Sequence, residues 1–284
     1  MSIGASDPVT RKFNDLLSSL RLAASAVLAY SGGVDSSFLL KAMKVSGIRF
    51  LAVTAFSETM PEKDFNHALS FAKETGVEHL IIHTDELSNE SFVSNPPDRC
   101  FFCKEELFRK LREIAAERSC EHLFDGTNID DLSDYRPGLK AAALYGVRSP
   151  LAESGFAKED IRRMSRELGL STWDRPSSPC LSSRFPYGRR ITISGLRQVE
   201  QAEEFLREFG LQEVRVRNHG DIARIEVSEK DMQVLLATDN RRKITEALKA
   251  LGFSFVSLDL DGYISGSLNR TLKEGIAGKP GAST

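Results

Sequence analysis

The chain has 284 residues and a formal net charge of −2, from 38 basic and 40 acidic side chains. This length predicts two domains with a sizeable core, and the near balance of charge gives no electrostatic footprint for a long nucleic acid such as DNA. No apolar run reaches the ~18 residues of a membrane span, and the N-terminus lacks the order of a signal peptide. We therefore expect a cytoplasmic chain with no membrane partner.

Residues 1 to about 185 alternate short apolar runs with amphipathic stretches. We expect a helix after the first strand and further helices at 61–75, 105–118 and 158–168, between strands at 26–30, 50–55, 79–82 and 122–125. Strands separated by helices predict an α/β fold with a doubly wound parallel sheet, which binds ligands at the carboxyl ends of its strands.

The pattern changes after the segment 175–188, which holds three prolines and four serines and cannot be regular structure for long. Helices at 196–209 and 239–251 and strands at 213–216, 222–227 and 253–260 then predict a small α+β domain. We expect one domain over 1–185, a second over 186–275 and a disordered tail over 276–284.

The most informative stretch is Ser31-Gly32-Gly33-Val34-Asp35-Ser36, between the first expected strand and its helix. Glycines let backbone N–H groups approach an anion, the helix N-terminus is partly positive, and serine hydroxyls can donate to phosphate oxygens. Asp35 would repel bare phosphate, so we expect it to hold Mg²⁺ or to cap the helix. The spacing is neither that of a Walker loop nor Gly-x-Gly-x-x-Gly; an ordinary strand-to-helix turn is the alternative.

In this context the stretch resembles the PP-loop of the N-type ATP pyrophosphatases. The resemblance implies that residues 31–36 bind ATP, that ATP is cleaved to AMP and pyrophosphate, and that an oxygen of the substrate is adenylated.

A second motif, Asp125-Gly126-Thr127-Asn128-Ile129-Asp130-Asp131, ends the fourth expected strand. In a parallel sheet this loop lies beside the phosphate loop, where Asp35 and Asp130 can hold Mg²⁺ and Arg136 can stabilise the leaving pyrophosphate. PP-loop enzymes that resemble this chain carry Gly-Thr-Asn in the same order, so we expect residues 126–128 to contact the nucleotide. A turn that only caps the next helix is the alternative.

The four cysteines form a third pattern. Cys100 and Cys103 are spaced Cys-x-x-Cys before an expected helix, whose N-terminus and flanking cations favour thiolates, and Cys180 lies in the Pro/Ser segment. In a cytosolic chain such a pair is more often a metal or redox site than a structural disulfide. Cys120 is most simply a buried small hydrophobe.

These motifs, with Asp134-Tyr135-Arg136-Pro137-Gly138 and the run from Cys180 to Gly188, resemble the LarE-type sulfur transferases over nearly the whole chain. The resemblance implies ATP-dependent conversion of pyridinium-3,5-biscarboxylic acid mononucleotide to its bisthiocarboxylic form, on the route to the nickel-pincer nucleotide cofactor of lactate racemase. It also implies a homo-oligomer, a trimer or hexamer, with Cys180, Arg136 and Asp35 as the catalytic residues.

Two sulfur sources are compatible with the sequence. In one, Cys180 attacks the acyl adenylate and is left as dehydroalanine, so the enzyme is consumed. In the other, Cys100, Cys103 and Cys180 hold a [4Fe–4S] cluster whose fourth iron carries the sulfide. The Cys-x-x-Cys pair is surplus in the first route, so we favour the cluster. A zinc site or a persulfide on Cys180 remains an alternative.

The small domain offers arginines for an anionic substrate. Alternation along the expected strand puts Arg215 and Arg217 on one face, near Glu226 of the next strand. Family members bind the substrate phosphate with arginines in this region, so we expect Arg184, Arg215, Arg217 and Glu226 to do so here. A solvated sheet face is the alternative.

Two other functions compete with this hypothesis. A tRNA-thiolating PP-loop enzyme also pairs Cys-x-x-Cys with a distant cysteine, but it should carry a basic surface or an RNA-binding module. A nucleotide sensor would bind ATP or AMP without turnover.

Overall fold

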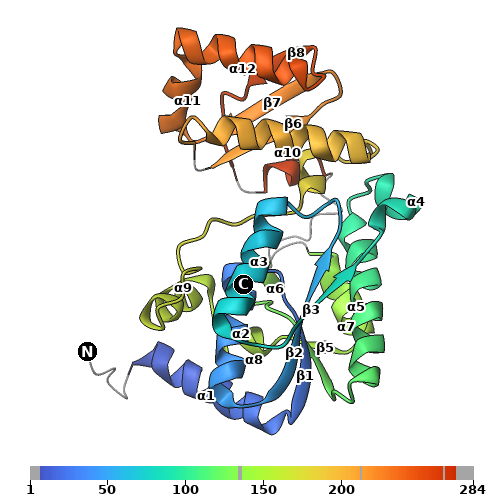
Figure 1. The fold of residues 1–284 in the computed structure, drawn as a ribbon, viewed down its shortest axis with the longest axis vertical. Coiled ribbons are helices and arrows are strands. Elements are labelled where there is room, and N and C mark those ends of the chain that lie inside the picture. The colour runs from blue at the N-terminus through green and yellow to red at the C-terminus, as the bar shows by residue number, and fades with distance from the viewer. Residues whose placement is uncertain (1–6, 134–135, 212, 265, 273–284) are drawn as a thin grey trace, which may run out of the picture. The chain divides into compact units, whose positions relative to one another are not determined.

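The computed structural model describes residues 7–133, 136–211, 213–264 and 266–272. The chain forms two compact units (Figure 1): Met1–Glu86 with Cys100–Ser178, and Leu87–Arg99 with Pro179–Thr284. The sequence-based boundary near residue 185 divides the chain differently. The expected tail, 276–284, lies outside the described residues.

Buried hydrogen bonds explain why residues 87–99 and 179–185 belong to the second unit. The amide of buried Asn95 donates to the carbonyl of Phe185 at 3.2 Å, and the N–H of Gly188 donates to the Asn95 carbonyl at 2.8 Å. A buried asparagine needs such partners, so this short excursion of the chain stays with the second unit.

The first unit contains a five-stranded sheet with the strand order β3-β2-β1-β4-β5, in which all neighbours are parallel. Its strands are β1 (Ser25–Ala29), β2 (Arg49–Phe56), β3 (His79–His83), β4 (His122–Phe124) and β5 (Val147–Arg148). Its helices are α1 (Pro8–Leu22), α2 (Val34–Ser46), α3 (Glu62–Thr75), α5 (Arg99–Glu117), α6 (Ile129–Leu132), α7 (Gly138–Leu144), α8 (Pro150–Glu153) and α9 (Lys158–Glu167). The predicted α/β class with a parallel sheet is confirmed.

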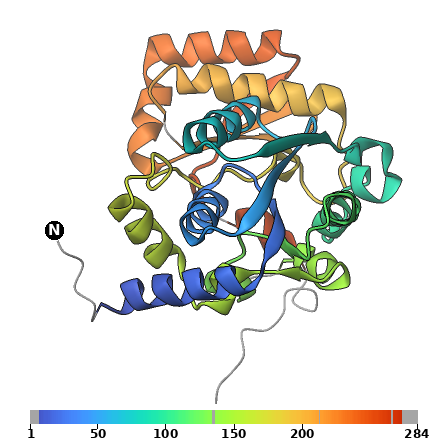
Figure 2. The ribbon, with the colours of Figure 1, turned by 60° about the horizontal axis from the view of Figure 1, so that its bottom comes forward.

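Helices cover both faces of this sheet (Figures 1 and 2). Alternating residues of β1 enter different cores because successive side chains of a strand point to opposite faces. Ala26 and Leu28 join Phe38 of α2 in one core, and Val27 joins Phe108 of α5 in the other. This is the doubly wound arrangement that the sequence predicts.

The strand order predicts where a ligand would bind on this sheet. The chain passes from β1 to β2 on one side, whereas β4 pairs with β1 on the other. Open α/β sheets bind ligands at the carboxyl ends of the strands where the order reverses, which here is between β1 and β4.

Several helices differ from the sequence-based expectation, and α7 and α8 were not predicted at all. Helix α5 begins at Arg99 rather than near residue 105, so its N-terminal end contains the Cys-x-x-Cys pair. Helix α1 was not predicted; the Asp7 side chain caps it by accepting a hydrogen bond from the N–H of Thr10, and Leu16 and Leu20 bury its inner face. Of the helices in the described ranges, none has the length and apolar character needed to cross a membrane.

The second unit contains a three-stranded sheet with the order β6-β7-β8. Its elements are α4 (Glu90–Val93), α10 (Ile193–Arg207), β6 (Val214–Asn218), β7 (Ile222–Val227), α11 (Glu229–Leu236), α12 (Thr238–Ala250) and β8 (Phe255–Leu258). Short 3₁₀ turns are η1 (Glu86–Ser88), where the first unit passes into the second, η2 (Leu181–Arg184) and η3 (Ser267–Thr271).

The two faces of this sheet differ in character. Strands β6 and β7 are antiparallel, and β8 is parallel to β7. The register pairs Arg215 with Glu226 and Arg217 with Arg224, so these charged residues share one face. Val214 and Val216 lie on the other face, fully buried. The small α+β architecture expected from the sequence is present.

Candidate functional site

The phosphate loop joins the end of β1 to the start of α2. Gly32 has a φ of 72°, and a Cβ placed on it would lie 2.7 Å from the Cβ of Ala68 in α3. Both the backbone conformation and the close approach of α3 therefore require glycine. Gly33 is the N-cap of α2 and supplies no side-chain cap, so the N-terminus of this helix is open to an anion.

Serine hydroxyls gather at this open end. The Oγ atoms of Ser31 and Ser36 are 3.1 Å apart, and the hydroxyl of Ser36 lies 3.3 Å from the carbonyl of Gly33. These contacts hold the loop in place before any ligand binds. The donor set of hydroxyls and helix N–H groups fits the phosphates of a nucleotide.

Asp35, in the first turn of α2, has an unusual electrostatic environment. Burial raises its pKa to about 6, the charge of Asp131 adds to this rise, and Lys158 and Arg162 oppose it. Within the described residues, no cation makes an ion pair with Asp35 that would offset its burial. A carboxylate in this situation is stabilised by a bound divalent cation.

The loop after β4 lies beside the phosphate loop, as expected. A Cβ on Gly126 would be 2.9 Å from the backbone nitrogen of Ser36. Asn128 is fully buried and its Oδ1 accepts hydrogen bonds from the N–H groups of Asp130 and Asp131, while its Nδ2 has no partner among the described residues. Such an amide is a candidate donor to a ligand.

The two aspartates of this loop have different surroundings. Asp130 is exposed, and its Oδ2 accepts a hydrogen bond of 2.7 Å from the N–H of Lys158 at the start of α9. Asp131 is buried; its Oδ1 lies 2.7 Å from Arg136 and 3.0 Å from the Lys158 Nζ. The structure thus brings Asp131, rather than Asp130, into the electrostatic environment of Asp35.

Asp131 is therefore a residue that the sequence analysis missed. The spacing Asn-x-x-Asp from Asn128 to Asp131 could have revealed it, because this pair forms a capping box on α6. The adjacent Asp134 and Tyr135 lie outside the described residues.

The Cys-x-x-Cys pair lies at the N-terminal end of α5. Cys100 is exposed and Cys103 is half-buried, one helical turn later. The thiol of Cys103 lies 3.5 Å from Oε1 of Glu86, which also accepts a hydrogen bond from the hydroxyl of Thr84 at 3.0 Å. The partly positive helix N-terminus favours anionic ligands such as thiolates at this place.

Cys180 belongs to the second unit, where it begins the turn η2. Its carbonyl accepts a hydrogen bond of 3.2 Å from Arg184, whose side chain is only 1% exposed. Arg184 also binds both carboxylate oxygens of Glu203, at 2.8 and 2.9 Å. A phosphate on Arg184 would have to displace one of these partners.

The three candidate cluster ligands are thus divided between the units. Cys100 and Cys103 belong to the first unit and Cys180 to the second. Over the described ranges, the structure has no group of three or more His, Cys, Asp or Glu side chains placed to hold a metal ion.

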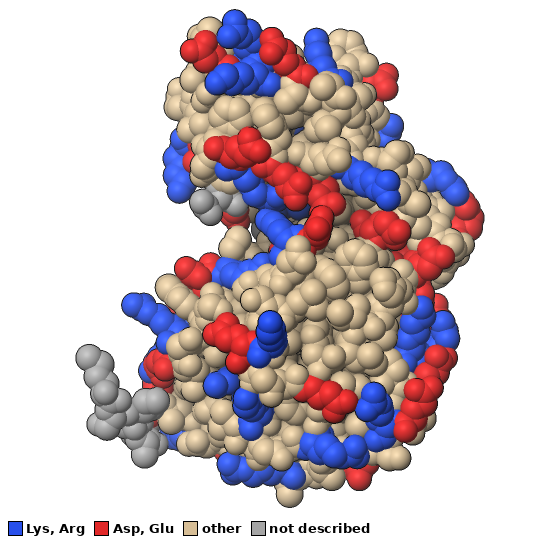
Figure 3. Space-filling view, viewed as in Figure 1, with Lys and Arg blue, Asp and Glu red and all other residues tan. Residues whose placement is uncertain are grey.

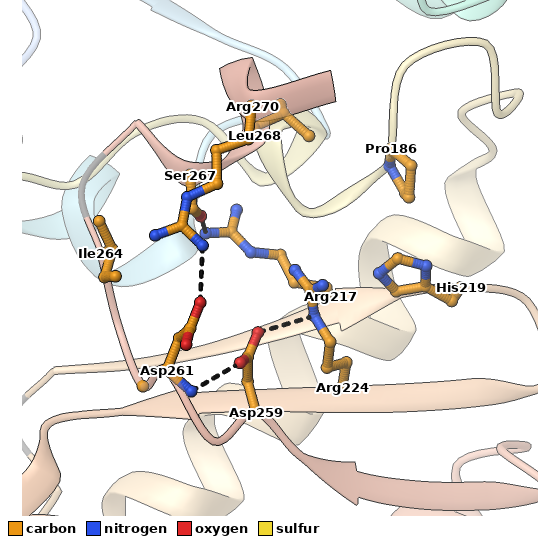
Figure 4. Close-up of a pocket in the computed structure, with 11 residues that line it drawn as sticks. Pro186, Arg217, His219, Arg224, Asp259, Asp261, Ile264, Ser267, Leu268 and Arg270 are labelled. Carbon is orange, nitrogen blue, oxygen red and sulfur yellow. Dashed lines mark hydrogen bonds and ion pairs between the residues drawn. The ribbon is translucent and has the colours of Figure 1, made fainter. Parts of the chain in front are cut away.

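Arg217 lines a pocket of about 160 Å³ in the second unit (Figure 4). The guanidinium donates to the carbonyl of Ser183 at 2.9 Å and to Glu226 at 2.6 Å. The other lining residues are Pro186, His219, Arg224, Asp259, Asp261, Gly262, Ile264, Ser267, Leu268 and Arg270. With Arg217 the pocket has three arginines and one histidine against two aspartates, a set that favours an anion, although Arg224 and Arg270 already pair with Asp259 and Asp261.

The other predicted phosphate residues lie deeper. Arg215 is buried, and its guanidinium lies 5.0 Å from the ring centre of Tyr263. Burial lowers its pKa, and nearby Arg184 lowers it further. Glu226 is buried between Arg217 and Arg224, with hydrogen bonds to both. Of the four predicted residues, Arg217 alone is among those that line the pocket.

A parallel sheet with Ser-Gly-Gly-Val-Asp-Ser at its switch point defines a protein of the PP-loop ATP pyrophosphatase class. No family model matches the chain. It is 43% identical over 248 residues to the uncharacterized protein slr1717 of Synechocystis sp., covering 87% of this chain and 92% of the relative.

The chain is also 40% identical over 259 residues to the pyridinium-3,5-bisthiocarboxylic acid mononucleotide synthase of Lactiplantibacillus plantarum, covering 90% of this chain and 93% of the relative. A more distant relative is the tRNA-specific 2-thiouridylase MnmA of Beijerinckia indica, 26% identical over 63% of this chain and 52% of the relative. The chain belongs to the LarE-type sulfur transferase family, which includes the Lactiplantibacillus synthase.

Proposed function

We propose that this protein is an ATP-dependent sulfur transferase that converts pyridinium-3,5-biscarboxylic acid mononucleotide to its bisthiocarboxylic form. The name of the Lactiplantibacillus relative supports the substrate class. The single observation that carries the ATP dependence is the open N-terminus of α2, with converging serine hydroxyls and a carboxylate that lacks an ion-pair partner among the described residues. This combination suits a nucleotide that binds with a divalent cation.

In the first step, an oxygen of the substrate carboxylate attacks the α-phosphorus of ATP. The bond to the β-phosphate oxygen breaks, pyrophosphate leaves, and the carboxylate becomes an acyl adenylate. The hydroxyls and N–H groups of residues 31–36 would hold the phosphates, and Arg136 would stabilise charge on the departing pyrophosphate.

The residues around Asp35 fit a magnesium ion, because carboxylate oxygens are its preferred protein ligands. Asp35 would hold the ion, which when bound neutralises phosphate charge. As a second carboxylate we propose Asp131 rather than the predicted Asp130, because the charge of Asp131 acts on Asp35 whereas Asp130 is exposed; the ion would then compete with Arg136 and Lys158 for Asp131.

For the sulfur, Cys100, Cys103 and Cys180 have the thiol donors that a [4Fe–4S] cluster requires. We propose that they hold such a cluster, which when bound would supply sulfide from its unligated iron. The alternative uses Cys180 alone: its thiolate displaces AMP, a base removes the Cα proton, and the Cβ–S bond breaks to leave the sulfur on the substrate and dehydroalanine in the protein.

The pocket at Arg217 is the proposed site for the phosphate of the mononucleotide. Arg217 and Arg224 would face the phosphate, and Arg270 lies at the same pocket (Figure 4). Buried Glu226 binds both Arg217 and Arg224 and would hold their guanidinium groups in place.

Pyrophosphate release and intact mass test this proposal together. We expect pyrophosphate only when the pyridinium substrate is present, and several thiolated products per chain with an unchanged protein mass if the cluster supplies sulfur. A loss of one hydrogen sulfide at Cys180 would show the sacrificial route. Absence of substrate-dependent pyrophosphate would refute the proposed activity.

A tRNA substrate is the competing proposal, because MnmA is a distant relative. Acidic and basic side chains are interspersed over the face shown in Figure 3, which does not favour a long polyanion. Salt-sensitive binding of tRNA would support this rival.

A further inference from the structure

One arginine outside the predicted motifs reaches the phosphate loop. Arg175 lies in the segment between α9 and Cys180, and its Nη1 donates a hydrogen bond of 3.0 Å to the carbonyl of Gly32. Its Nη2 donates to Oδ1 of Asp64 at 2.9 Å. One planar guanidinium therefore binds both the phosphate loop and α3, a fork-like geometry that lysine cannot reproduce.

Asp64 connects this arginine to a second residue of the same segment. It is a buried residue in the first turn of α3, and its Oδ2 accepts a hydrogen bond from the hydroxyl of Ser178. Both carboxylate oxygens are thus bound by residues that lie within four positions of each other. Gly32, Asp64, Arg175 and Ser178 form one network, here called the Arg175 network.

Helix α9 holds the same segment from its other end. Arg162 donates to the carbonyl of Trp173 at 2.9 Å and to the carbonyl of Arg175 at 2.6 Å. The guanidinium of Arg166 lies 5.1 Å from the ring centre of Trp173. The segment from Trp173 to Ser178 is therefore fastened to the first unit by side chains along its length, although it contains no helix or strand.

Cys180 follows Ser178 by only two positions, so the contacts that hold Ser178 also restrict the position of Cys180. Two residues of fully extended chain span at most about 7 Å. The bond between Ser178 and Asp64 consequently limits how far the backbone of Cys180 can move from the first turn of α3. A change in the phosphate loop at Gly32 would reach this segment directly through Arg175.

We propose that Arg175 is a positioning residue that couples nucleotide binding at the phosphate loop to the placement of Cys180. The inference rests on the proposed function, because it gives Cys180 a role in sulfur delivery. Coupling of this kind is reciprocal: nucleotide changes the environment of Cys180, and the segment of Cys180 changes the affinity for nucleotide.

The first experiment measures the rate at which iodoacetamide alkylates Cys180, resolved by peptide mass spectrometry, with and without the α,β-methylene analogue of ATP. In the wild type we expect the analogue to change this rate at least about fivefold. In Arg175→Ala the ratio of the alkylation rates with and without the analogue should approach one. The control Arg163→Ala removes an exposed arginine of α9 that pairs with Asp7 and Glu167, and it should keep the wild-type ratio.

The second experiment compares the two chemical steps in the same variants. Arg175→Ala should keep substrate-dependent pyrophosphate release within severalfold of wild type, while the thiolated product per pyrophosphate falls about tenfold or more, because a misplaced nucleophile loses proximity. Asp64→Asn keeps the size of the side chain and removes its charge. It should change both readouts as Arg175→Ala does, with a larger loss of thiolated product than of pyrophosphate. Thermal unfolding confirms that each variant is folded.

Three results would overturn the inference: an analogue that leaves Cys180 alkylation unchanged in the wild type, the same ratio in Arg175→Ala as in the wild type, or equal losses of pyrophosphate and product. These outcomes are separable from failure of the proposed function. A wild type that responds to the analogue through Arg175, yet releases no pyrophosphate with the pyridinium substrate, would refute the function and keep the coupling.

Discussion

Two acidic residues, one in each unit, have opposite electrostatic environments. Glu203 of α10 is 1% exposed and binds Arg184 through both oxygens, and it also accepts hydrogen bonds from Arg207 and from the N–H of Val216. Burial alone would raise its pKa, but Arg184 above all lowers it. Burial raises the pKa of Asp35 to about 6, and the described residues offer it no ion pair.

The comparison separates a structural carboxylate from one that is ready for a ligand. The chain itself compensates Glu203, so its charge is part of the folded structure. The ionised form of Asp35 is buried without a compensating ion pair among the described residues, and a cation in the site would stabilise it. Groups with pKa values perturbed in this way cluster at functional sites. The four predictions below test this distinction from the largest expected effect to the smallest.

Glu203→Ala should be the most destabilising of these changes. It leaves the guanidinium of Arg184 buried without its counter-charge, and breaking such a pair costs about 3–5 kcal/mol of unfolding free energy. Chemical denaturation measures the loss. The control Glu153→Ala removes the half-exposed partner of Arg148 and should cost less than about 1 kcal/mol. Equal effects of the two substitutions would remove the basis of the comparison.

Asp35→Ala should show the opposite pattern. Pyrophosphate release should fall about 100-fold or more, since removal of one group that organises charge at a transition state costs that much. The unfolding free energy of the ligand-free protein should not decrease, because a poorly compensated carboxylate is removed. A variant that keeps full activity would show that Asp35 is not part of the nucleotide site.

The two carboxylates should also respond oppositely to pH. The pKa of Asp35 rises from 3.8 to about 6 on folding, so its contribution to stability declines as pH rises from about 4 to 6, by at most about 3 kcal/mol. Glu203, with a lowered pKa, contributes stability above its unfolded pKa and loses it as pH falls through the folded value. Denaturation of Asp35→Asn across this range should lack the Asp35 decline; an unchanged profile would contradict its assignment.

Gly32→Ala tests the loop around Asp35 without altering any charge. The new Cβ would clash with Ala68, and the alanine would have to adopt a positive φ. We therefore expect the unfolding free energy to fall by about 1–3 kcal/mol and nucleotide binding to weaken. Gly47→Ala is a matched control, because its φ is 79° and its Cβ would meet no atom within 4 Å. It should lose about 1 kcal/mol and keep nucleotide affinity; a similar loss of affinity would show that the contact with Ala68 is unimportant.

Much of the first unit could be predicted from local sequence patterns. Short apolar runs between amphipathic stretches predicted the parallel sheet, and the carboxyl ends of adjacent parallel strands brought Gly126 to Ser36. The Cys-x-x-Cys pair was expected before a helix, yet it lies inside α5, because helix ends are the least certain part of a sequence-based prediction.

The remaining features depend on contacts between residues far apart in the chain. Arg175 binds Asp64, 111 positions earlier, and Asn95 binds the carbonyl of Pro186, 91 positions later. No periodicity within a helix or strand marks such partners, since each is chosen by the folded arrangement of the segments. The environment of Asp35 is likewise set by Asp131 and Lys158 from two later elements.

The excursion of residues 87–99 into the second unit has a consequence for dissecting this protein. The chain crosses between units at 86–87, 99–100 and 178–179, so no single cut yields an intact half. A fragment that starts at Pro179 would lack Asn95 and Val93, and it would leave the N–H groups of Gly188 and Ile191 without their acceptors. A genetically separated second unit should therefore fold only when residues 87–99 are supplied, either fused or as a peptide added in trans.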